Sequence, residues 1–168
     1  AGFDSVSISD HFHPWVTEQG HSPFVWSVLG AIAEATDSIE VAVGVTCPTV
    51  RIHPAIVAHA AATSALLLEG RFVLGLGTGE ALNEHILGHR WPPPETRRAM
   101  LAEAVEVMRS LWTGETVDHD GDFYRVENAR LFDVPDAGIP LVISGFGQES
   151  VELAARVCDG FWGHSPDA

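Results

Sequence analysis

The stretch that decides the fold is 72-FVLGLGTGEALNE-84, an apolar run that ends in a glycine-rich turn. Residues 72–76 form a short run that is apolar throughout, which predicts a strand buried on both faces. Residues 94–112 then place apolar side chains at helical spacing, and Gly114 marks the end of that helix. A buried strand, a polar turn and a helix in this order are typical of a parallel sheet covered by helices.

The same unit recurs on both sides of this stretch. Further strands are predicted at residues 3–9, 39–45, 140–144 and 160–164, and further helices at 22–34, 54–68 and 148–157. Residues 115–133 differ, because two short strands around Asp120-Gly121 predict an inserted β-hairpin with a two-residue turn. We therefore expect residues 1–168 to form a single α/β domain with one insertion.

The sequence is compatible with two arrangements of such strands and helices: a doubly wound sheet, and part of a (β/α)8 barrel. A complete barrel needs roughly 250 residues, and the chain has 168. If the sheet is of the barrel type, we expect the chain to be a partial TIM barrel whose other units lie outside it.

The composition restricts the class of function. The chain has a formal charge of −14 and no lysine, because all nine of its basic residues are arginine. Lysine-dependent chemistry within the chain is therefore excluded, and nucleic acid is not an expected partner. We expect neither a membrane span nor a signal peptide. Cys47 and Cys158 form no disulfide or metal framework and are expected to be reduced thiols in a cytoplasm.

Polar, ionisable and glycine residues gather where the predicted strands end. In either kind of sheet these carboxyl ends meet at one edge, where enzymes of these folds place their reactive groups. This distribution predicts an enzyme, although loops are often polar for no reason other than exposure. The segments concerned are 10–15, 44–48, 78–80, 145–147 and 164–165, the last of which contains His164.

Three side chains at these strand ends have chemistry of their own. His11 could accept a proton near neutral pH, and the indole N–H of Trp15 could stabilise a developing anion. Glu80 follows the glycine turn, where the backbone leaves room for a planar ring or a phosphate and a carboxyl group could donate a proton. The turn is not a dinucleotide-binding fingerprint, because Leu82 stands at its third glycine position. The alternative is a surface histidine, a packing tryptophan and a helix-start glutamate.

His11 and His13 also form the His-x-His pattern found in barrel-type metal hydrolases. Residues two apart on a strand face the same side, so both imidazoles could bind one ion. Such a site needs further ligands at later strand ends, for which His164 is a candidate. A metal-dependent hydrolase is therefore an alternative function, although no metal is expected.

Several motifs occur together and in order, and their combination is specific. Their sequences are Ser9-Asp10-His11 with Trp15, Pro48-Thr49 with Pro54, Gly-Thr-Gly-Glu-Ala-Leu-Asn-Glu at 77–84, and Asp-Gly-Asp-Phe-Tyr at 120–124. On these motifs the chain resembles, over essentially its whole length, the deazaflavin-dependent glucose-6-phosphate dehydrogenases and their relatives in the bacterial luciferase-like superfamily. The resemblance implies a (β/α)8 barrel that forms a homodimer, with this chain on about strands two to six.

The resemblance also implies coenzyme F420, a 5-deazaflavin that accepts hydride, or FMN as in other branches of the superfamily. It assigns His11 to removing the proton of a substrate hydroxyl, Trp15 to stabilising the resulting anion, and Glu80 to donating a proton to N1 of the reduced ring. It places a cis peptide at Gly44–Val45, behind the ring. The cofactor-binding residues that it implies are Asp10, Gly44, Val45, Cys47, Thr78, Gly79, Asn83, Gly145, Phe146, Gly147 and Gln148.

Two departures from the family pattern restrict the substrate. Where relatives bind the cofactor phosphate with a Gly-Gly-Pro loop, this chain has Phe146-Gly147-Gln148-Glu149, and the Glu149 carboxylate is expected to repel the phosphate. Asp167 stands where the sugar-phosphate enzymes have a substrate-binding lysine. We therefore expect hydride transfer with a small alcohol, a carbonyl or an activated alkene, and not with glucose 6-phosphate.

Overall fold

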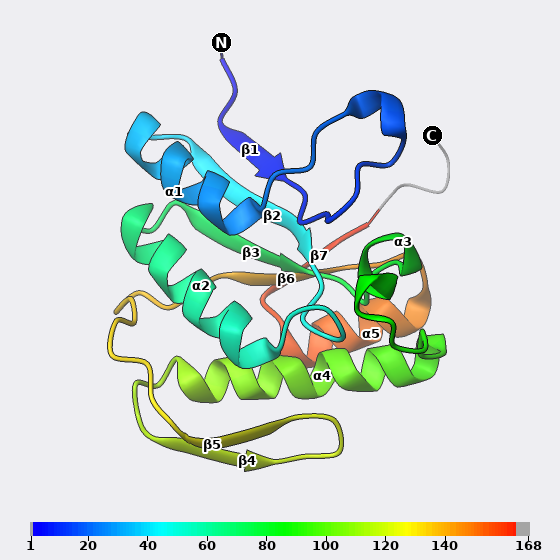
Figure 1. Cartoon of the computed structure of the whole chain (residues 1–168). Helices are drawn as coiled ribbons and strands as arrows, with labels where there is room; N and C mark the ends of the chain where they lie inside the picture. Colours follow the sequence, from blue (N-terminus) through cyan, green and yellow to red (C-terminus); the bar gives the residue numbers. More distant parts are fainter. Residues whose placement is uncertain (1, 164–168) are drawn as a thin grey trace.

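The computed structural model describes residues 2–163, which form a sheet covered by helices (Figure 1). The first half contains β1 (Ser5–Ile8), α1 (Val25–Ala35), β2 (Glu40–Thr46), α2 (Pro54–Leu67) and β3 (Phe72–Leu76). The short α3 (Ala81–Glu84) and the long α4 (Pro94–Leu111) follow. The remaining elements are β4 (Val117–Asp120), β5 (Arg125–Ala129), β6 (Leu141–Ser144), α5 (Gln148–Val157) and β7 (Gly160–Trp162). Each predicted strand and helix is present, whereas His164 and Asp167 lie outside the described residues.

The strand order decides between a doubly wound sheet and part of a barrel. The five-stranded sheet has the order β1-β2-β3-β6-β7, and each neighbouring pair is parallel. A doubly wound sheet reverses its strand order at a switch point, whereas barrel strands follow one another around the sheet in chain order. The order contains no reversal, so the sheet is of the barrel type, and the described strands form an open segment of it.

Alternate residues of the strands pack into one hydrophobic core with the helices. Val43, Leu74 and Leu141 are completely buried there, beneath helices that contact one another in the order α1, α2, α4, α5. The intervening strand residues face the opposite side, where Gly44 and Gly75 leave room for the indole of Trp162. Within residues 2–163 no helix is both long enough and apolar enough to span a bilayer.

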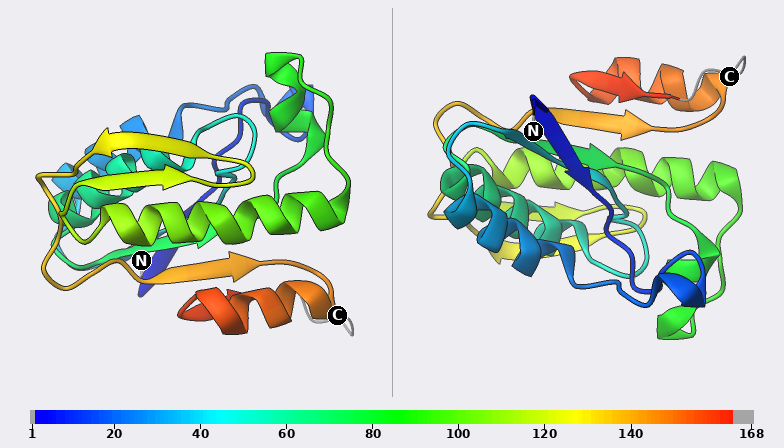
Figure 2. Two further views of the ribbon diagram at one scale, coloured as in Figure 1. Left: turned by 90° about the horizontal axis from the view of Figure 1, so that it is seen from below. Right: turned by 90° about the horizontal axis from the view of Figure 1, so that it is seen from above.

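The inserted hairpin lies on the outer side of α4, away from β6 (Figure 2). Its turn lies two residues later than predicted. Beyond the pair Asp120–Arg125, the N–H of Gly121 donates to the carbonyl oxygen of Tyr124 at 3.0 Å, so Asp122 and Phe123 form the turn instead of Asp120 and Gly121. The carboxylate of Glu103 on α4 is the cause, since it accepts the N–H groups of Phe123 and Tyr124 in place of a partner strand. Burial alone would raise the pKa of Glu103, but these bonds and that from His119 lower it.

Tyr124 connects the hairpin to the edge of the sheet. Its buried hydroxyl lies 3.1 Å from the carbonyl oxygen of Pro48 and 3.2 Å from that of Thr49, to which it donates. Burial raises the pKa of this phenol, so it stays protonated and keeps its role as a donor. The loop after β2 is thereby held in place from outside the sheet.

Candidate active site

A cavity of about 590 Å³ opens at the carboxyl ends of the strands. Its size falls within the range of small-molecule and cofactor sites. Among the residues predicted from sequence, those that line it are Asp10, His11, Trp15, Gly44, Val45, Cys47, Thr78, Gly79, Glu80, Asn83, Gly145, Phe146 and Gly147. The segments that follow β1, β2, β3 and β6 therefore converge on one space, as the barrel geometry requires.

His11 and Trp15 form one wall of the cavity. Their ring centroids lie 5.3 Å apart with the planes tilted by 56°. The backbone of His11 is anchored by the hydroxyl of Ser22, which donates to its carbonyl oxygen at 2.7 Å. No hydrogen bond to the imidazole occurs within residues 2–163, so the ring is available to a ligand in the cavity.

Glu80 lines the same cavity, at the residue that precedes α3. Its carbonyl oxygen accepts the N–H groups of Asn83 and Glu84, which starts the helix. Its carboxylate is exposed to the cavity and makes no hydrogen bond with the described part of the chain. A carboxyl group in this position can exchange a proton with whatever the cavity holds.

Part of the cavity lining is main chain. Gly44 and Val45 are joined by a cis peptide bond, as the sequence resemblance implied, and both line the cavity. Gly147 lies on the same cavity, and a Cβ built on it would meet nothing within 4 Å. At Gly147 a flat ring system can therefore approach the main chain closely.

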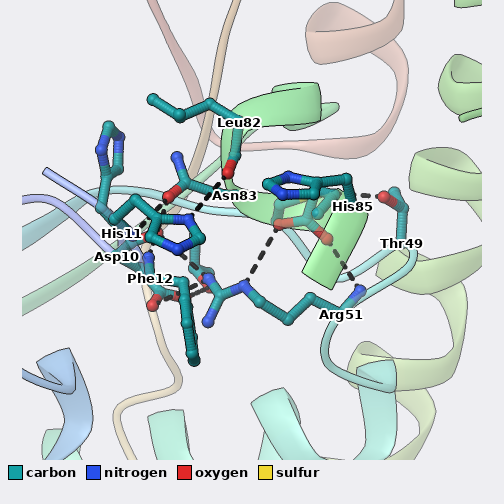
Figure 3. A network of polar contacts seen from close by, with 12 residues as sticks. Asp10, His11, Phe12, Thr49, Arg51, Leu82, Asn83 and His85 are labelled. Atoms are coloured by element: carbon teal, nitrogen blue, oxygen red, sulfur yellow. Dashed lines mark hydrogen bonds and ion pairs between the residues drawn. The ribbon is translucent and has the colours of Figure 1, made fainter. Parts of the chain in front are cut away.

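Asn83 has a structural task that its sequence position did not reveal. Its side-chain oxygen accepts the N–H of Phe12 at 2.9 Å and that of His13 at 3.0 Å (Figure 3). The side-chain amide of Asn83 thus holds the backbone directly after His11. Because His11 and Glu80 are on the two segments that this amide joins, Asn83 fixes their separation.

A buried ion network lies behind His11. The guanidinium of Arg51 is 3.0 Å from the carboxylate of Asp10 and 3.3 Å from that of Glu84, and all three side chains are almost completely buried (Figure 3). The hydroxyl of Thr46 also donates to Asp10. Burial raises the pKa of Glu84, although its contacts with Arg51 oppose that rise. The carboxylate of Asp10 therefore points into the protein, towards Arg51 and Thr46.

The loop after β6 differs from expectation in two ways. Gln148 does not line the cavity, because its amide donates to Glu152 at 2.7 Å along the surface of α5. The carboxylate of Glu149 is not an isolated negative charge, because it lies 2.7 Å from the guanidinium of Arg98. The repulsion expected between Glu149 and a phosphate is therefore offset by a cation on α4.

Within residues 2–163, His11 and His13 are not joined by further metal-binding side chains. The Nδ1 atom of His13 lies 3.1 Å from the carbonyl oxygen of Leu82, and its ring stacks on that of His85. Residues 2–163 contain no group of three or more His, Cys, Asp or Glu side chains arranged to hold a metal ion. The structure thus gives the hydrolase alternative no support.

Three arginines belong to the site although the sequence did not single them out. Arg97 and Arg98 line the cavity from the first turns of α4, and Arg51 lies behind it. The sequence offers one signal for them. The chain has only nine arginines and a formal charge of −14, so each arginine is a candidate partner for buried carboxylates.

Gly79→Ala is expected to lower the free energy of unfolding by about 1–3 kcal/mol. Gly79 has a φ of +80°, and a Cβ there would run into the buried sulfur of Cys47. Gly147→Ala is the matched control, because its φ of −132° suits any residue and its Cβ would meet open space. Urea denaturation of both variants measures the difference. Equal stability of the two would show that the turn tolerates a side chain.

Comparisons with known proteins agree with this geometry. A family model described as luciferase-like monooxygenase matches residues 1–168. The chain is 47% identical over 162 residues to the F420-dependent glucose-6-phosphate dehydrogenase of Mycobacterium avium, a match that covers 95% of this chain and 48% of that protein. It is 46% identical over 162 residues to the enzyme of that name from Nocardia farcinica, with the same coverage. The chain thus spans about half the length of the curated relatives it matches.

Solved structures show the same architecture. An F420-dependent secondary alcohol dehydrogenase in complex with an F420-acetone adduct matches with a TM-score of 0.92 and 39% identity, over 96% of this chain and 49% of that one. The F420-dependent tetrahydromethanopterin reductase of Methanopyrus kandleri matches in fold, with a TM-score of 0.81 at 23% identity, over 97% of this chain and 48% of that one. With a family model matched from end to end and this likeness of fold, the chain belongs to the luciferase-like monooxygenase family.

Proposed function

We propose that the protein is an F420-dependent oxidoreductase that transfers a hydride between the deazaflavin and a small alcohol, carbonyl or activated alkene. The observation that supports this most directly is that His11, Trp15 and Glu80 line one cavity. The relatives named above, all called F420-dependent, support the choice of cofactor.

The residues present fit a planar tricyclic ring. The main chain at Gly44–Val45 lines the cavity, and Gly147 adds a stretch of main chain without a Cβ to the same lining. When bound, a 5-deazaflavin supplies two-electron hydride chemistry. Asp10, Cys47, Thr78 and Asn83 would lie along its edges, together with Gly145 and Phe146 from the loop after β6.

His11 and Trp15 would act on the substrate oxygen. In the direction of alcohol oxidation the hydroxyl proton moves to a nitrogen of the His11 imidazole, while the hydride leaves the carbinol carbon. The indole N–H of Trp15 donates to the oxygen as negative charge develops on it. Both rings also border a second hollow of about 310 Å³ formed by residues 8–23, which offers room for the remainder of a small substrate.

Glu80→Gln is expected to slow hydride transfer by about a hundredfold and to leave cofactor affinity nearly unchanged. The amide keeps the shape of the side chain but cannot release a proton from its oxygen to the cavity. Single-turnover absorbance of the deazaflavin in the intact protein measures the rate. Glu106→Gln is the control, because Glu106 is an exposed acid on α4 that does not line the cavity. A lowered thermal midpoint in Glu80→Gln, with the rate unchanged, would make the glutamate structural.

Cofactor titrations test the proposal as a whole. F420 and FMN are added separately to the intact protein that contains this chain, and fluorescence reports binding. We expect F420 to bind at least about tenfold more tightly than FMN, followed by reduction of F420 by a small secondary alcohol. Tighter binding of FMN would move the protein to a flavin-dependent branch of the family.

The proposal extends to assembly and location. On the family resemblance we propose a homodimer, which sedimentation of the intact protein tests. Cys47 and Cys158 are both free thiols, which is typical of proteins in a reducing compartment. We therefore propose that the protein works in the cytoplasm, and fractionation of its source cells tests that location.

A further inference from the structure

The charges that line the cavity are arranged unequally. Four acids face it, namely Asp10, Glu80, Glu84 and Glu149, and two cations, Arg97 and Arg98. Arg51 already neutralises Asp10 and Glu84 from behind. The charges of Asp10 and Glu84 are therefore balanced by Arg51. At the other edge of the lining, near the start of α5, Arg97 and Arg98 of α4 provide positive charge.

Arg98 is held by a partner that can leave. Its guanidinium lies 2.7 Å from the carboxylate of Glu149, but the Glu149 side chain is 69% exposed and that of Arg98 only 26%. An exposed ion pair of this kind contributes little free energy, because each charge is well solvated when the pair opens. Glu149 can therefore swing into water while Arg98 stays at the cavity.

Arg97 supplies a second donor that is only partly used. One terminal nitrogen donates to the carbonyl oxygen of Gly79 at 3.2 Å, and the guanidinium lies over the ring of Trp91 at 4.6 Å. Its Nε is buried without a hydrogen-bond partner, and Arg97 has no carboxylate partner within residues 2–163. The guanidinium is thus fixed in place with a positive charge that no carboxylate in the described part of the chain compensates.

The start of α5 adds backbone donors to the same edge. Gly147 precedes the helix, and its carbonyl oxygen accepts the N–H groups of Ser150 and Val151, so the N–H groups of Gln148 and Glu149 are not used by the helix. Unused amides and the helix dipole favour an anion at this end. The carboxylate of Glu149, in the first turn of this helix, already reaches the guanidinium of Arg98, so an anion bound at the helix start would lie beside that cation.

We propose that Arg98 and Glu149 form an exchangeable anion site, in which the phosphate of the bound cofactor replaces the Glu149 carboxylate on Arg98. Glu149 thereby acts as an internal competitor that sets how strongly the phosphate contributes to binding. The site takes over the task that a Gly-Gly-Pro loop performs in the sequence pattern of the relatives. That the anion belongs to a deazaflavin rests on the proposed function; the site itself rests on the charges at this edge.

The experiment measures the contribution of the phosphate alone. The intact protein is titrated with two pairs that differ only in a 5′-phosphate, the deazariboflavin 5′-phosphate against the deazariboflavin and FMN against riboflavin. For each pair we determine the dissociation constant of the phosphate-free ligand divided by that of the phosphorylated one. Arg98→Gln is expected to reduce this ratio at least about tenfold, because a charge-assisted bond to phosphate is lost. Glu149→Gln is expected to raise it about two- to fivefold, because the competing carboxylate is removed.

Arg109→Gln is the matched control. Arg109 stands on the same helix and pairs with Asp159 at 3.3 Å, on a face that does not line the cavity. The ratio of dissociation constants in Arg109→Gln is expected to equal that of the parent protein. A ratio unchanged in Arg98→Gln would overturn the proposal, as would equal weakening of the phosphorylated and phosphate-free ligands. If Arg98→Gln does not fold, an unchanged ratio in Glu149→Gln is sufficient to overturn it.

A second measurement separates this proposal from the proposed function. Inorganic phosphate is expected to raise the thermal midpoint of the parent protein and of Glu149→Gln, but not that of Arg98→Gln. This result supports the anion site even if neither deazaflavin nor flavin binds, an outcome that would refute the proposed function alone. A sugar phosphate that needs Arg98 for binding, with cofactor ratios unchanged, would assign the anion to the substrate and overturn the proposal.

Discussion

His11→Ala is expected to slow hydride transfer by about 10²–10⁴-fold and to leave the affinity for F420 nearly unchanged. The imidazole lines the cavity and makes no hydrogen bond within residues 2–163, so its removal takes away a proton acceptor and the ring contact with Trp15, but no hydrogen bond. The backbone around it is held by Ser22 and Asn83, through bonds that do not involve the ring. The loop is therefore expected to keep its shape in the variant.

The measurement is a single turnover with a small secondary alcohol, after the affinity for F420 has been determined by fluorescence. His13→Ala is the control, since this neighbouring imidazole bonds to the carbonyl oxygen of Leu82 and stacks on His85. We expect its rate to stay within about tenfold of the parent protein. Equal losses in both variants would mean that the loop, and not the proton acceptor, determines the rate. Loss of F420 binding in His11→Ala would contradict the role assigned to His11.

The strands and long helices could be predicted because their signals are local. The run 72–76 is apolar from end to end, and it forms β3 with the predicted bounds. Pro54 and Pro94 each open a helix, where the missing N–H of proline costs nothing. The sheet order could not be decided from these signals, because strand pairing depends on contacts between residues far apart in the chain.

The hairpin turn shows how a distant side chain overrides a local signal. Asp120-Gly121 is a strong two-residue turn sequence. Glu103, some twenty residues earlier, binds the N–H groups of Phe123 and Tyr124, and the turn forms at Asp122 and Phe123, closed by the bond from the N–H of Gly121 to the carbonyl oxygen of Tyr124. No pattern in residues 116–126 contains that information.

The same distinction applies to the cavity. The segments that contain His11 and Glu80 could be predicted as neighbours, because the carboxyl ends of parallel strands share one edge. The partners of Asp10 and Glu149 could not, since Arg51 and Arg98 lie on other units of the fold. The sequence therefore predicts that the Glu149 carboxylate is unpaired and repels a phosphate. In the structure this carboxylate pairs with Arg98, from which an anion could displace it.

Arg51→Met is expected to lower the free energy of unfolding by about 3–5 kcal/mol, which is the usual cost of removing one partner from a buried ion pair. Methionine fills much of the space, so the main loss is electrostatic: Asp10 and Glu84 would be left as two buried carboxylates without a cation. The N–H of residue 51 would still reach Glu84, but the carboxylate of Asp10 would keep only Thr46. Urea denaturation of the intact protein measures the change.

Arg125→Met is the matched control, because it removes the same charge by the same substitution from an exposed pair. Arg125 and Asp120 are 2.6 Å apart but about 80% exposed, and such pairs contribute no more than about 1 kcal/mol.

The pH dependence of the stability provides a further check. In Arg51→Met, the pKa of Glu84, already raised by burial, rises further without its cation, so the folded protein binds more protons than the unfolded chain. The stability deficit should therefore shrink towards about pH 5 and grow towards about pH 8. A deficit that is independent of pH would mean that Arg51 stabilises the site by packing, and that the charges of Asp10 and Glu84 are balanced in some other way.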